Sequence, residues 1–276
     1  MNPIVSVCVP THKTTPYLRE TVGNIFSQTL RSWELVLCIN STDAAVVEAI
    51  KGSLSEFLKD PRVRLIVEAR PLNMAGNWNA AVSHAHGEFI KLLCHDDLLY
   101  PDSLERQVKS LQDHPEAVLA SGARTIINGK GKPLFTRSGI RKQGIHPGRK
   151  MIRECLMAGT NIIGDPVNVM WRRSAIEKIG YFDPTVVYCT DIEYWLRLLS
   201  IGDLYYDTKP VGFYRIHPAA AGVGLADVTV QDFLHTAHLQ EKLGNVKLSP
   251  MDRRLIALRS RLQSMLRQYL YRILGS

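Results

Sequence analysis

Two adjacent aspartates, Asp96 and Asp97, follow the apolar run 88–95 and stand shortly before Pro101. Two carboxylates at the end of a strand repel one another, so ionising both costs free energy unless something compensates. A divalent cation or a helix N-terminus would do so, and Mg²⁺ or Mn²⁺ prefers carboxylate oxygens together with the phosphates of a substrate. The structural alternative is that Asp96 is a turn residue and that Asp102 caps the following helix.

The elements that must position these acids are predicted from the hydrophobic pattern. Over the first 114 residues, the predicted strands are 4–10, 33–40, 63–69 and 88–95, and the predicted helices are 17–30, 44–59, 74–86 and 101–114. This alternation predicts an α/β fold with a mostly parallel sheet and helices on both faces. Ligands of such sheets bind at the carboxyl ends of the strands, where the polar residues of this sequence gather.

The alternation breaks near residue 120. The segment 128–150 is rich in glycine, proline and cations, which predicts a mobile loop that is either a solvated excursion or a lid over an acceptor. The tail 251–274 has an apolar stripe with arginines on its flanks, which predicts an amphipathic basic helix. Between them we expect a helix at 148–158, a strand at 167–171, a helix start at Ser174, a turn at 181–184 and a helix at 191–200.

The composition limits which classes of protein are possible. The 276 residues, 45% of them hydrophobic, suffice for one substantial core. The net charge is +8, and residues 252–276, with six arginines and one aspartate, supply +5 of it. No basic region has the interleaved aromatic residues of a nucleic-acid module.

The expected location follows from the cysteines and the apolar runs. Five cysteines without C-x-x-C spacing indicate buried thiols in a reducing compartment. The sequence has no run resembling a signal peptide or a membrane span. We therefore expect a cytoplasmic protein, at the inner face of the membrane if the tail helix binds lipid.

The chain resembles a known family over residues 4–217. The segments that carry the likeness are VSVCVPTHK, SQTLRSWELVLCINSTD, NMAGNWNAAVSHAHGEFIKLLCHDDLLYPDSLE, GYFDPTVVYCTDIEYWLRLLSIGD and FYRIH, in that order. They resemble the inverting family 2 glycosyltransferases, which have the Rossmann-like GT-A fold. The resemblance implies transfer of a sugar from a nucleotide-diphosphate donor, with a divalent cation, Mn²⁺ or Mg²⁺, on the diphosphate.

The resemblance also implies a metal site. It makes Asp97 the metal ligand and places Asp96 beside it, toward the ribose and sugar of the donor. A late histidine completes the metal shell in many such enzymes, so His217 is a candidate ligand, another active-site contact or a structural loop residue. Many members have a further aspartate where Cys94 stands, so a site of three carboxylates is not available here.

Further positions match the donor pocket of the family. Asn40 stands where many members have an aspartate that accepts a hydrogen bond from uracil N3–H. An amide oxygen can accept the same bond without charge assistance, so a preference for pyrimidines is left open. The other matches are Pro10 and Thr11 beside the base and ribose, Asn73, Gly76 and Asn79 of the N-x-x-G-x-x-N segment, and Arg70 toward the diphosphate.

Asp191 matches the catalytic base of the family. Inverting transfer needs an in-line attack, in which a positioned carboxylate takes the proton of the acceptor hydroxyl as the new bond forms. With an ordinary pKa of about 3.9, Asp191 would be ionised at neutral pH. The structural alternative is a helix cap after Thr190. Trp195, one turn later on the same helix face, would either stack on an acceptor sugar or belong to the core.

The leading expectation is a metal-dependent, inverting, nonprocessive glycosyltransferase of surface polysaccharide or glycolipid biosynthesis. Its partners would be a nucleotide-diphosphate sugar, with a UDP-sugar favoured, and a saccharide or lipid-linked acceptor. The Q-x-x-R-W segment of chain-synthesising relatives is missing, which supports a nonprocessive enzyme. A dinucleotide-dependent oxidoreductase would need G-x-G-x-x-G after the first strand, where PTHKTTP stands. The other alternative is an inactive sugar-nucleotide-binding or scaffold protein, because Cys94 and Asn40 replace two frequent acids.

We expect a catalytic domain over 1–220, with a nucleotide-sugar half at 1–118 and an acceptor half at 119–220. A basic helical extension over 221–276 would follow. Its apolar stripe could bind an anionic membrane surface, pack on the catalytic domain or form a homodimer.

Overall fold

The structure is a computed structural model that describes residues 3–217 and 226–274. Its strands are β1 (Val5–Thr11), β2 (Trp33–Asn40), β3 (Val63–Glu68), β4 (Phe89–Leu92), β5 (Leu98–Leu99), β6 (Ala117–Asn128), β7 (Pro133–Arg137), β8 (Gly144–His146), β9 (Met170–Arg172) and β10 (Asp203–Ile216). Its helices are α1 (Leu18–Phe26), α2 (Ala44–Ser53), α3 (Met74–Ser83), α4 (Ser103–Asp113), α5 (Gly148–Ala158), α6 (Ile176–Ile179), α7 (Thr190–Leu199), α8 (Ala226–Lys242) and α9 (Pro250–Leu274). Three short 3₁₀ turns are η1 (Phe57–Lys59), η2 (Pro166–Asn168) and η3 (Arg173–Ala175).

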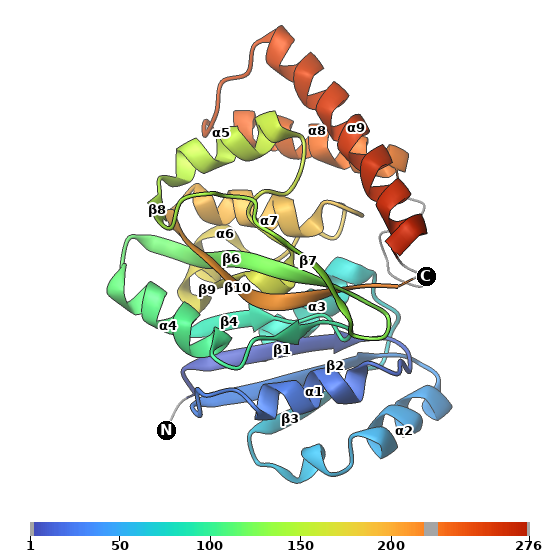
Figure 1. The fold of residues 1–276 in the computed structure, drawn as a ribbon. Coiled ribbons are helices and arrows are strands. Elements are labelled where there is room, and N and C mark those ends of the chain that lie inside the picture. The colour runs from blue at the N-terminus through green and yellow to red at the C-terminus, as the bar shows by residue number, and fades with distance from the viewer. Residues whose placement is uncertain (1–2, 218–225, 275–276) are drawn as a thin grey trace.

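All described strands belong to one sheet, with the order β3-β2-β1-β4-β9-β6-β10-β5 (Figure 1). β1, β2, β3 and β4 are parallel, as are β6 and β10. β9 runs antiparallel between β4 and β6. The chain moves outward from β1 to β3 and then returns to place β4 on the other side of β1. The order of the strands therefore switches between β1 and β4, and this is where such sheets bind ligands.

Both faces of the sheet are covered, which explains the continuous hydrophobic strands. Val5, Val7 and Val9 of β1 belong to a core with α1, α2 and α4. Cys8, which points the other way, belongs to a core with α3, α5 and α7. The predicted α/β fold, with its mostly parallel sheet flanked by helices, is confirmed.

The elements predicted over the first 114 residues are present with small shifts at their ends. The predicted helix 44–59 divides into α2 and η1, and the two-residue strand β5 was not predicted. Asp102 stands before α4, but its side chain makes no capping hydrogen bond. It pairs instead with Arg106, at 3.0 Å.

The prediction of a mobile loop over 128–150 is wrong for β7 and β8. The Oδ1 of Asn128 accepts hydrogen bonds from the N–H groups of Lys130 and Lys132, each at 3.0 Å, and Gly131 has a φ of 79°. These features close a hairpin that pairs β7 with β6. β7 is largely exposed and β8 is half-buried, so neither strand has the buried apolar face that an alternating pattern would reveal.

The later strands also differ from the prediction. The expected strand at 167–171 divides into η2 and β9, and the helix expected from Ser174 is η3 followed by α6. The long strand β10 was not predicted. Its register shifts on both sides of Pro210, because proline interrupts a ladder of backbone hydrogen bonds, and this breaks the periodicity in the sequence.

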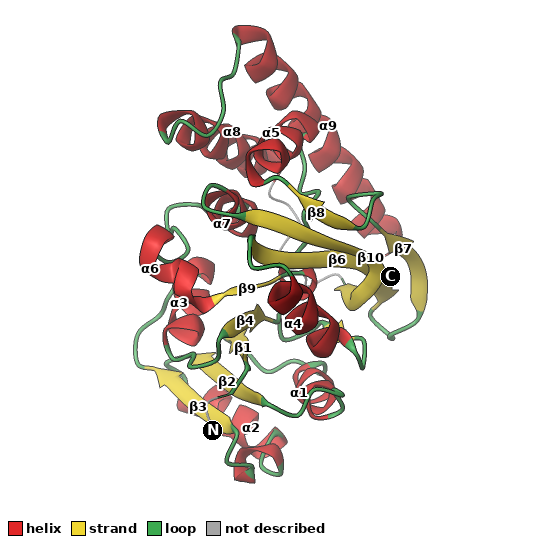
Figure 2. Cartoon of the chain, turned by 90° about the vertical axis from the view of Figure 1, so that its left-hand side faces the viewer, coloured by secondary structure: helices red, strands yellow, loops and turns green. Residues whose placement is uncertain are grey.

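The predicted C-terminal helices form a layer at one end of the molecule. Figures 1 and 2 show α5, α8 and α9 gathered beyond α7, at the opposite end from β3 and α2. α9 approaches the end of α5 closely at Gly159, which has a φ of 65°. A Cβ there would lie 2.6 Å from the backbone nitrogen of Ser260, so this contact requires glycine.

Trp195 is a core residue. It has no exposed surface, and its Nε1 donates a hydrogen bond to the carbonyl of Gly164 at 3.0 Å. The ring packs against Trp171, with their centroids 5.3 Å apart. The alternative that Trp195 stacks on an acceptor sugar is therefore wrong.

Candidate active site

A cleft of about 510 Å³ opens at the carboxyl ends of β1 and β4, where the strand order switches. Of the residues predicted for the donor pocket, Pro10, Asn40 and Asn73 line this cleft. The other predicted site residues are not in its lining; they are Thr11, Arg70, Gly76, Asn79, Asp96, Asp97, Asp191 and His217. Cys94 and His95, which follow β4, close the end of the cleft nearest the paired aspartates.

Arg215 of β10 fixes the loop that carries the paired aspartates. Its backbone N–H donates to Asp97 Oδ1 at 2.9 Å, and its Nε donates to the carbonyl of Asp96 at 2.8 Å. The guanidinium also pairs with Glu20 at 2.7 Å and lies over the ring of Tyr17, 4.5 Å from the centroid. Strand β10 and helix α1 thus hold the loop from two sides.

The two neighbouring carboxyl groups have different environments. Asp97 is 2% exposed, and burial, followed by the charge of Asp96, raises its pKa well above the usual range. Asp96 contacts His217, with 3.0 Å between Oδ2 and Nε2. Burial opposes ionisation of Asp96, but the hydrogen bond with His217 and the charge of His95 outweigh it and lower the pKa of Asp96. Asp97 thus directs Oδ1 to the N–H of Arg215 and Asp96 directs Oδ2 to His217, so the two carboxyl groups have different fixed partners.

The residues of this loop fit a hard divalent cation. Ligand atoms of Cys94, Asp96 and Asp97 all lie within 4.8 Å of one another, and His217 joins Asp96 from the other side. Burial and the nearby carboxylates raise the pKa of Cys94 well above its usual value, so its thiol stays protonated and is a poor ligand. Carboxylate oxygen and imidazole nitrogen suit Mn²⁺ and leave other positions for phosphate oxygens.

Asp191 lies in the first turn of α7, after its N-cap residue Cys189. Its Oδ2 accepts a hydrogen bond from Asn161 Nδ2 at 2.9 Å, and its Oδ1 accepts one from the N–H of Ile192 at 2.8 Å. Burial, followed by the charge of Asp165, raises the pKa of Asp191 to about 7. The expectation of an ordinary pKa for this group is therefore wrong.

Asp165 is a site residue that the sequence did not single out. It pairs with the buried Arg124 of β6 at 2.7 Å and raises the pKa of both Asp97 and Asp191. It stands in the segment GDPVN, whose Asp-Pro pair signals only a turn. Its importance comes from neighbours that lie far away in the sequence.

The paired aspartates and Asp191 converge on Cys94. After burial, the charges of Asp97, Asp96, Asp165 and Asp191 each raise the pKa of this one thiol. Such interactions weaken with distance, so these carboxylates surround a common place. Of these residues, Cys94 is the one that lines the cleft.

The asparagines of the N-x-x-G-x-x-N segment bind protein instead of facing the cleft with free amides. The side chain of Asn79 exchanges two hydrogen bonds with the backbone of Phe182, at 2.8 and 2.9 Å. Asn73 donates to the carbonyl of Pro184 at 2.7 Å and accepts from the N–H of Gly76 at 2.9 Å, which caps α3. Both residues therefore tie α3 to the loop that leads to α7.

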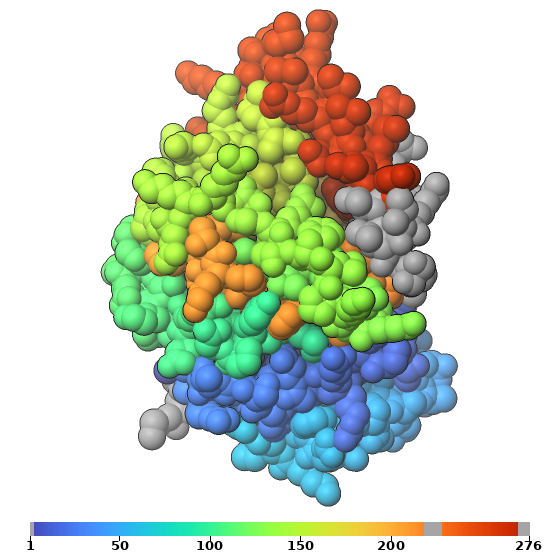
Figure 3. Space-filling view, in the orientation of Figure 1, coloured from blue at the N-terminus to red at the C-terminus, as the bar shows by residue number. Residues whose placement is uncertain are grey.

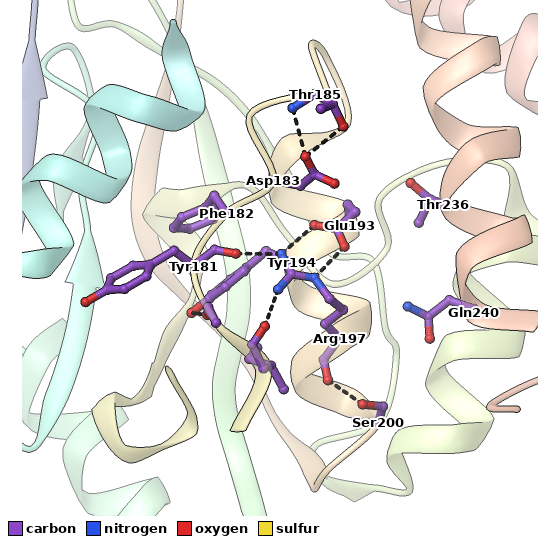
Figure 4. A network of polar contacts seen from close by, with 12 residues as sticks. Tyr181, Phe182, Asp183, Thr185, Glu193, Tyr194, Arg197, Ser200, Thr236 and Gln240 are labelled. Carbon is purple, nitrogen blue, oxygen red and sulfur yellow. Dashed lines mark hydrogen bonds and ion pairs between the residues drawn. The ribbon is translucent and has the colours of Figure 1, made fainter. Parts of the chain in front are cut away.

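Helix α7 is fixed further by a network around Arg197 (Figure 4). Arg197 pairs with Glu193, which has no exposed side-chain surface, and donates to the carbonyl groups of Ile179 and Tyr181 at 2.6 and 2.9 Å. From α8, Asp232 Oδ2 accepts hydrogen bonds from three successive N–H groups over 187–189. The position of Asp191 thus depends on contacts with α3 and α8.

The other predicted donor residues have varied environments. Asn40 exchanges two hydrogen bonds with the backbone of Leu72, at 2.9 and 3.2 Å, so its amide already braces the wall of the cleft. Thr11 is fully buried, and its hydroxyl donates to the carbonyl of Lys13 at 3.1 Å. Arg70 is exposed.

Comparisons with known proteins agree on the kind of protein. A sequence profile described as Glycosyl transferase family 2 matches residues 6–180. An uncharacterized glycosyltransferase of Rickettsia typhi is 23% identical over 226 residues, which are 79% of this chain and 65% of that protein. This chain therefore spans less than two thirds of the length of that relative.

Solved structures share the fold. S. aureus TarS 1-349, in complex with UDP-GlcNAc, has a TM-score of 0.63 at 15% identity over 98% of this chain and 88% of that one. The mannosyltransferase PcManGT from Pyrobaculum calidifontis, in complex with GDP-Man and Mn²⁺, has a TM-score of 0.63 at 17% identity. The likeness covers 99% of this chain and 74% of that one. The predicted GT-A fold is confirmed by these neighbours.

Replacing Asp165 by asparagine is expected to lower the pKa of Asp191 from about 7, because a nearby negative charge no longer opposes its ionisation. Burial remains, so the pKa should stay above the ordinary value of about 3.9. A ¹³C NMR titration of the carboxyl groups measures this shift. Asp113→Asn, at the exposed end of α4, is the control and should change nothing. An Asp191 pKa that is the same in Asp165→Asn and in the wild type contradicts the assignment.

Proposed function

Because the profile match covers more than half of it, the chain belongs to the family 2 glycosyltransferases, and we propose that it is an inverting enzyme that uses a divalent cation. The donor would be a nucleotide-diphosphate sugar, and the acceptor a hydroxyl group of a saccharide or lipid-linked substrate. The observation that supports the proposal is the cluster of Asp96 and Asp97 with His217 after β4, together with Asp191, whose charge reaches the same Cys94 thiol. A donor bound there would have a cation ligand and a base on its two sides.

Asp96 and His217 are our candidates for the residues that hold the cation. Asp97, which the family resemblance favoured, is buried with one oxygen on the N–H of Arg215, so we assign it to positioning the loop. A bound Mn²⁺ or Mg²⁺ would neutralise charge on the diphosphate as it leaves. The Mn²⁺ in the complex of PcManGT supports this choice of ion.

Asp191 is our candidate for the general base. A base works best when its pKa lies near the working pH, and the pKa of Asp191 is raised to about 7 by burial and Asp165. Asn161 donates to Asp191 Oδ2 and so orients the carboxyl group. The acceptor hydroxyl would transfer its proton to this carboxylate while its oxygen attacks the anomeric carbon, and the C–O bond to the diphosphate breaks on the opposite side.

Asn40 does not identify the nucleobase of the sugar donor, because both ends of its amide are hydrogen-bonded to the backbone of Leu72. TarS is seen with UDP-GlcNAc and PcManGT with GDP-Man, so both nucleotide classes occur on this fold. We propose a UDP-sugar as the first donor to test, in nonprocessive transfer for surface polysaccharide or glycolipid synthesis at the cytoplasmic side of a membrane.

Donor binding should stabilise the folded chain only when Mn²⁺ is present. At a ligand concentration of roughly a hundred times Kd, the unfolding midpoint should rise by about 5 °C. Thermal unfolding with UDP-, GDP- and dTDP-sugars, with and without Mn²⁺, measures the effect. Asp96→Asn should lose the part of the shift that depends on Mn²⁺, whereas the exposed control Asp113→Asn should keep it. A full Mn²⁺-dependent shift in Asp96→Asn would contradict the assigned ligand.

Turnover of the donor should rise with pH through about 7 and then level off, because Asp191 must be ionised to accept a proton. Asp191→Asn should lower kcat by about 10²- to 10⁴-fold and leave donor binding intact. Release of nucleoside diphosphate at saturating donor measures both effects. A flat profile across about pH 6 to 8, or near-normal kcat in Asp191→Asn, would exclude this base. Donor binding without turnover under any acceptor would favour the inactive relative.

A further inference from the structure

Helix α9 presents an apolar stripe to solvent. Its members are Met251, Leu258, Leu262, Met265, Leu266 and Tyr269, each between 54% and 63% exposed. Apart from the adjacent pair Met265 and Leu266, steps of three, four and seven residues separate them, so they lie along one side of the helix. Figure 3 shows this C-terminal segment, in red, on the outer surface of the molecule. Monomeric proteins rarely leave such a continuous apolar surface uncovered.

The stripe is not the face that packs on the rest of the protein. Ile256, Ser260 and Ser264, on the opposite side of α9, are at most 4% exposed. They face the layer formed by α5 and α8, and Ser260 lies against Gly159 of the turn after α5. The alternative that the stripe packs on the catalytic domain is therefore wrong for the described residues.

The charges beside the stripe are positive. Arg254 and Arg261 flank one edge of the stripe and are exposed. Arg259 flanks the other edge, where its guanidinium donates to the carbonyl of Met157. The single acid of the helix, Asp252, is in its first turn, where it pairs with Arg153 at 3.5 Å and accepts from the N–H of Ser249. An apolar stripe between cationic flanks matches the boundary between acyl chains and anionic headgroups.

A second copy of the chain fits this surface less well. Two α9 helices that met through their stripes would bring arginine flanks together, and Asp252, in the first turn, is the one acid of the helix that could pair with them. No helix within the described part of the chain is long and apolar enough to span a membrane. Contact with a lipid surface would therefore be peripheral and would use α9.

We propose that α9 docks this chain on an anionic phospholipid surface, with the stripe inserted at the headgroup boundary and Arg254 and Arg261 on lipid phosphates. The side of α9 that faces the protein carries Arg267, which donates to the hydroxyl of Tyr188, three residues before Asp191. This contact joins α9 to the residues that lead into α7. If the proposed function holds, the acceptor hydroxyl is presented by a lipid in that surface.

Vesicle co-sedimentation of the full chain tests the docking. It should pellet with vesicles of phosphatidylglycerol and phosphatidylcholine, less with phosphatidylcholine alone, and less as salt rises. The triple variant Leu258→Gln, Leu262→Gln, Met265→Gln should lower partitioning about tenfold or more. The matched control, Leu243→Gln with Ile201→Gln, replaces exposed apolar residues outside α9 and should pellet like the wild type.

The charge variants and the oligomeric state complete the test. Arg254→Gln with Arg261→Gln should weaken pelleting only on anionic vesicles, and Lys142→Gln with Arg149→Gln is the exposed, charge-matched control. Circular dichroism verifies that each variant is folded. Equal pelleting of stripe and control variants, or no pelleting of the wild type, overturns the proposal. A dimer seen by sedimentation velocity that the stripe variant abolishes, without vesicle binding, also overturns it. Donor hydrolysis is measured without lipid, so loss of the proposed function is distinguished from loss of docking.

Discussion

Arg215 is the contact on which the candidate site depends. Two adjacent carboxyl groups beside a cleft repel one another and lose solvation, so they need fixed hydrogen-bond donors. Arg215 is 2% exposed and supplies such donors to the backbone of Asp96 and the side chain of Asp97. Its own charge is balanced by Glu20 of α1. The last strand of the sheet therefore sets the geometry of a loop more than a hundred residues earlier.

This constraint gives the neighbouring acids different roles. Asp97 is held inward, and Asp96 is left beside His217, where a cation with a diphosphate can be bound. Burial and the charge of Asp165 raise the pKa of Asp191 to about 7. Helices α3 and α8 fix the approach to α7 through asparagine and aspartate contacts with its loop. The C-terminal helices are thus part of the support of the site as well as a surface layer.

The sequence predicted the fold and the family because local periodicity and spaced motifs carry that information. It also predicted which strand ends bear polar residues, since parallel strands share a carboxyl edge. Contacts between distant residues were not predictable. Nothing near Asp165 marks it as a neighbour of Asp191, and the motif with Asn73 and Asn79 does not disclose that these amides bind a loop a hundred residues later. Strands β7, largely exposed, and β8, half-buried, lack the buried face that would have revealed them.

The central claim is that the cation-binding loop and the base share one cleft. Paramagnetic broadening by Mn²⁺ tests it directly, because the effect falls off steeply with distance from the ion. On adding Mn²⁺ and UDP, the carboxyl ¹³C signals of Asp96 and Asp191 should both broaden, while that of Asp113 stays sharp. In Asp96→Asn, the same Mn²⁺ concentration should leave Asp191 sharp. Broadening at Asp96 without any at Asp191 would show that the cation binds far from Asp191, and this would contradict a shared cleft.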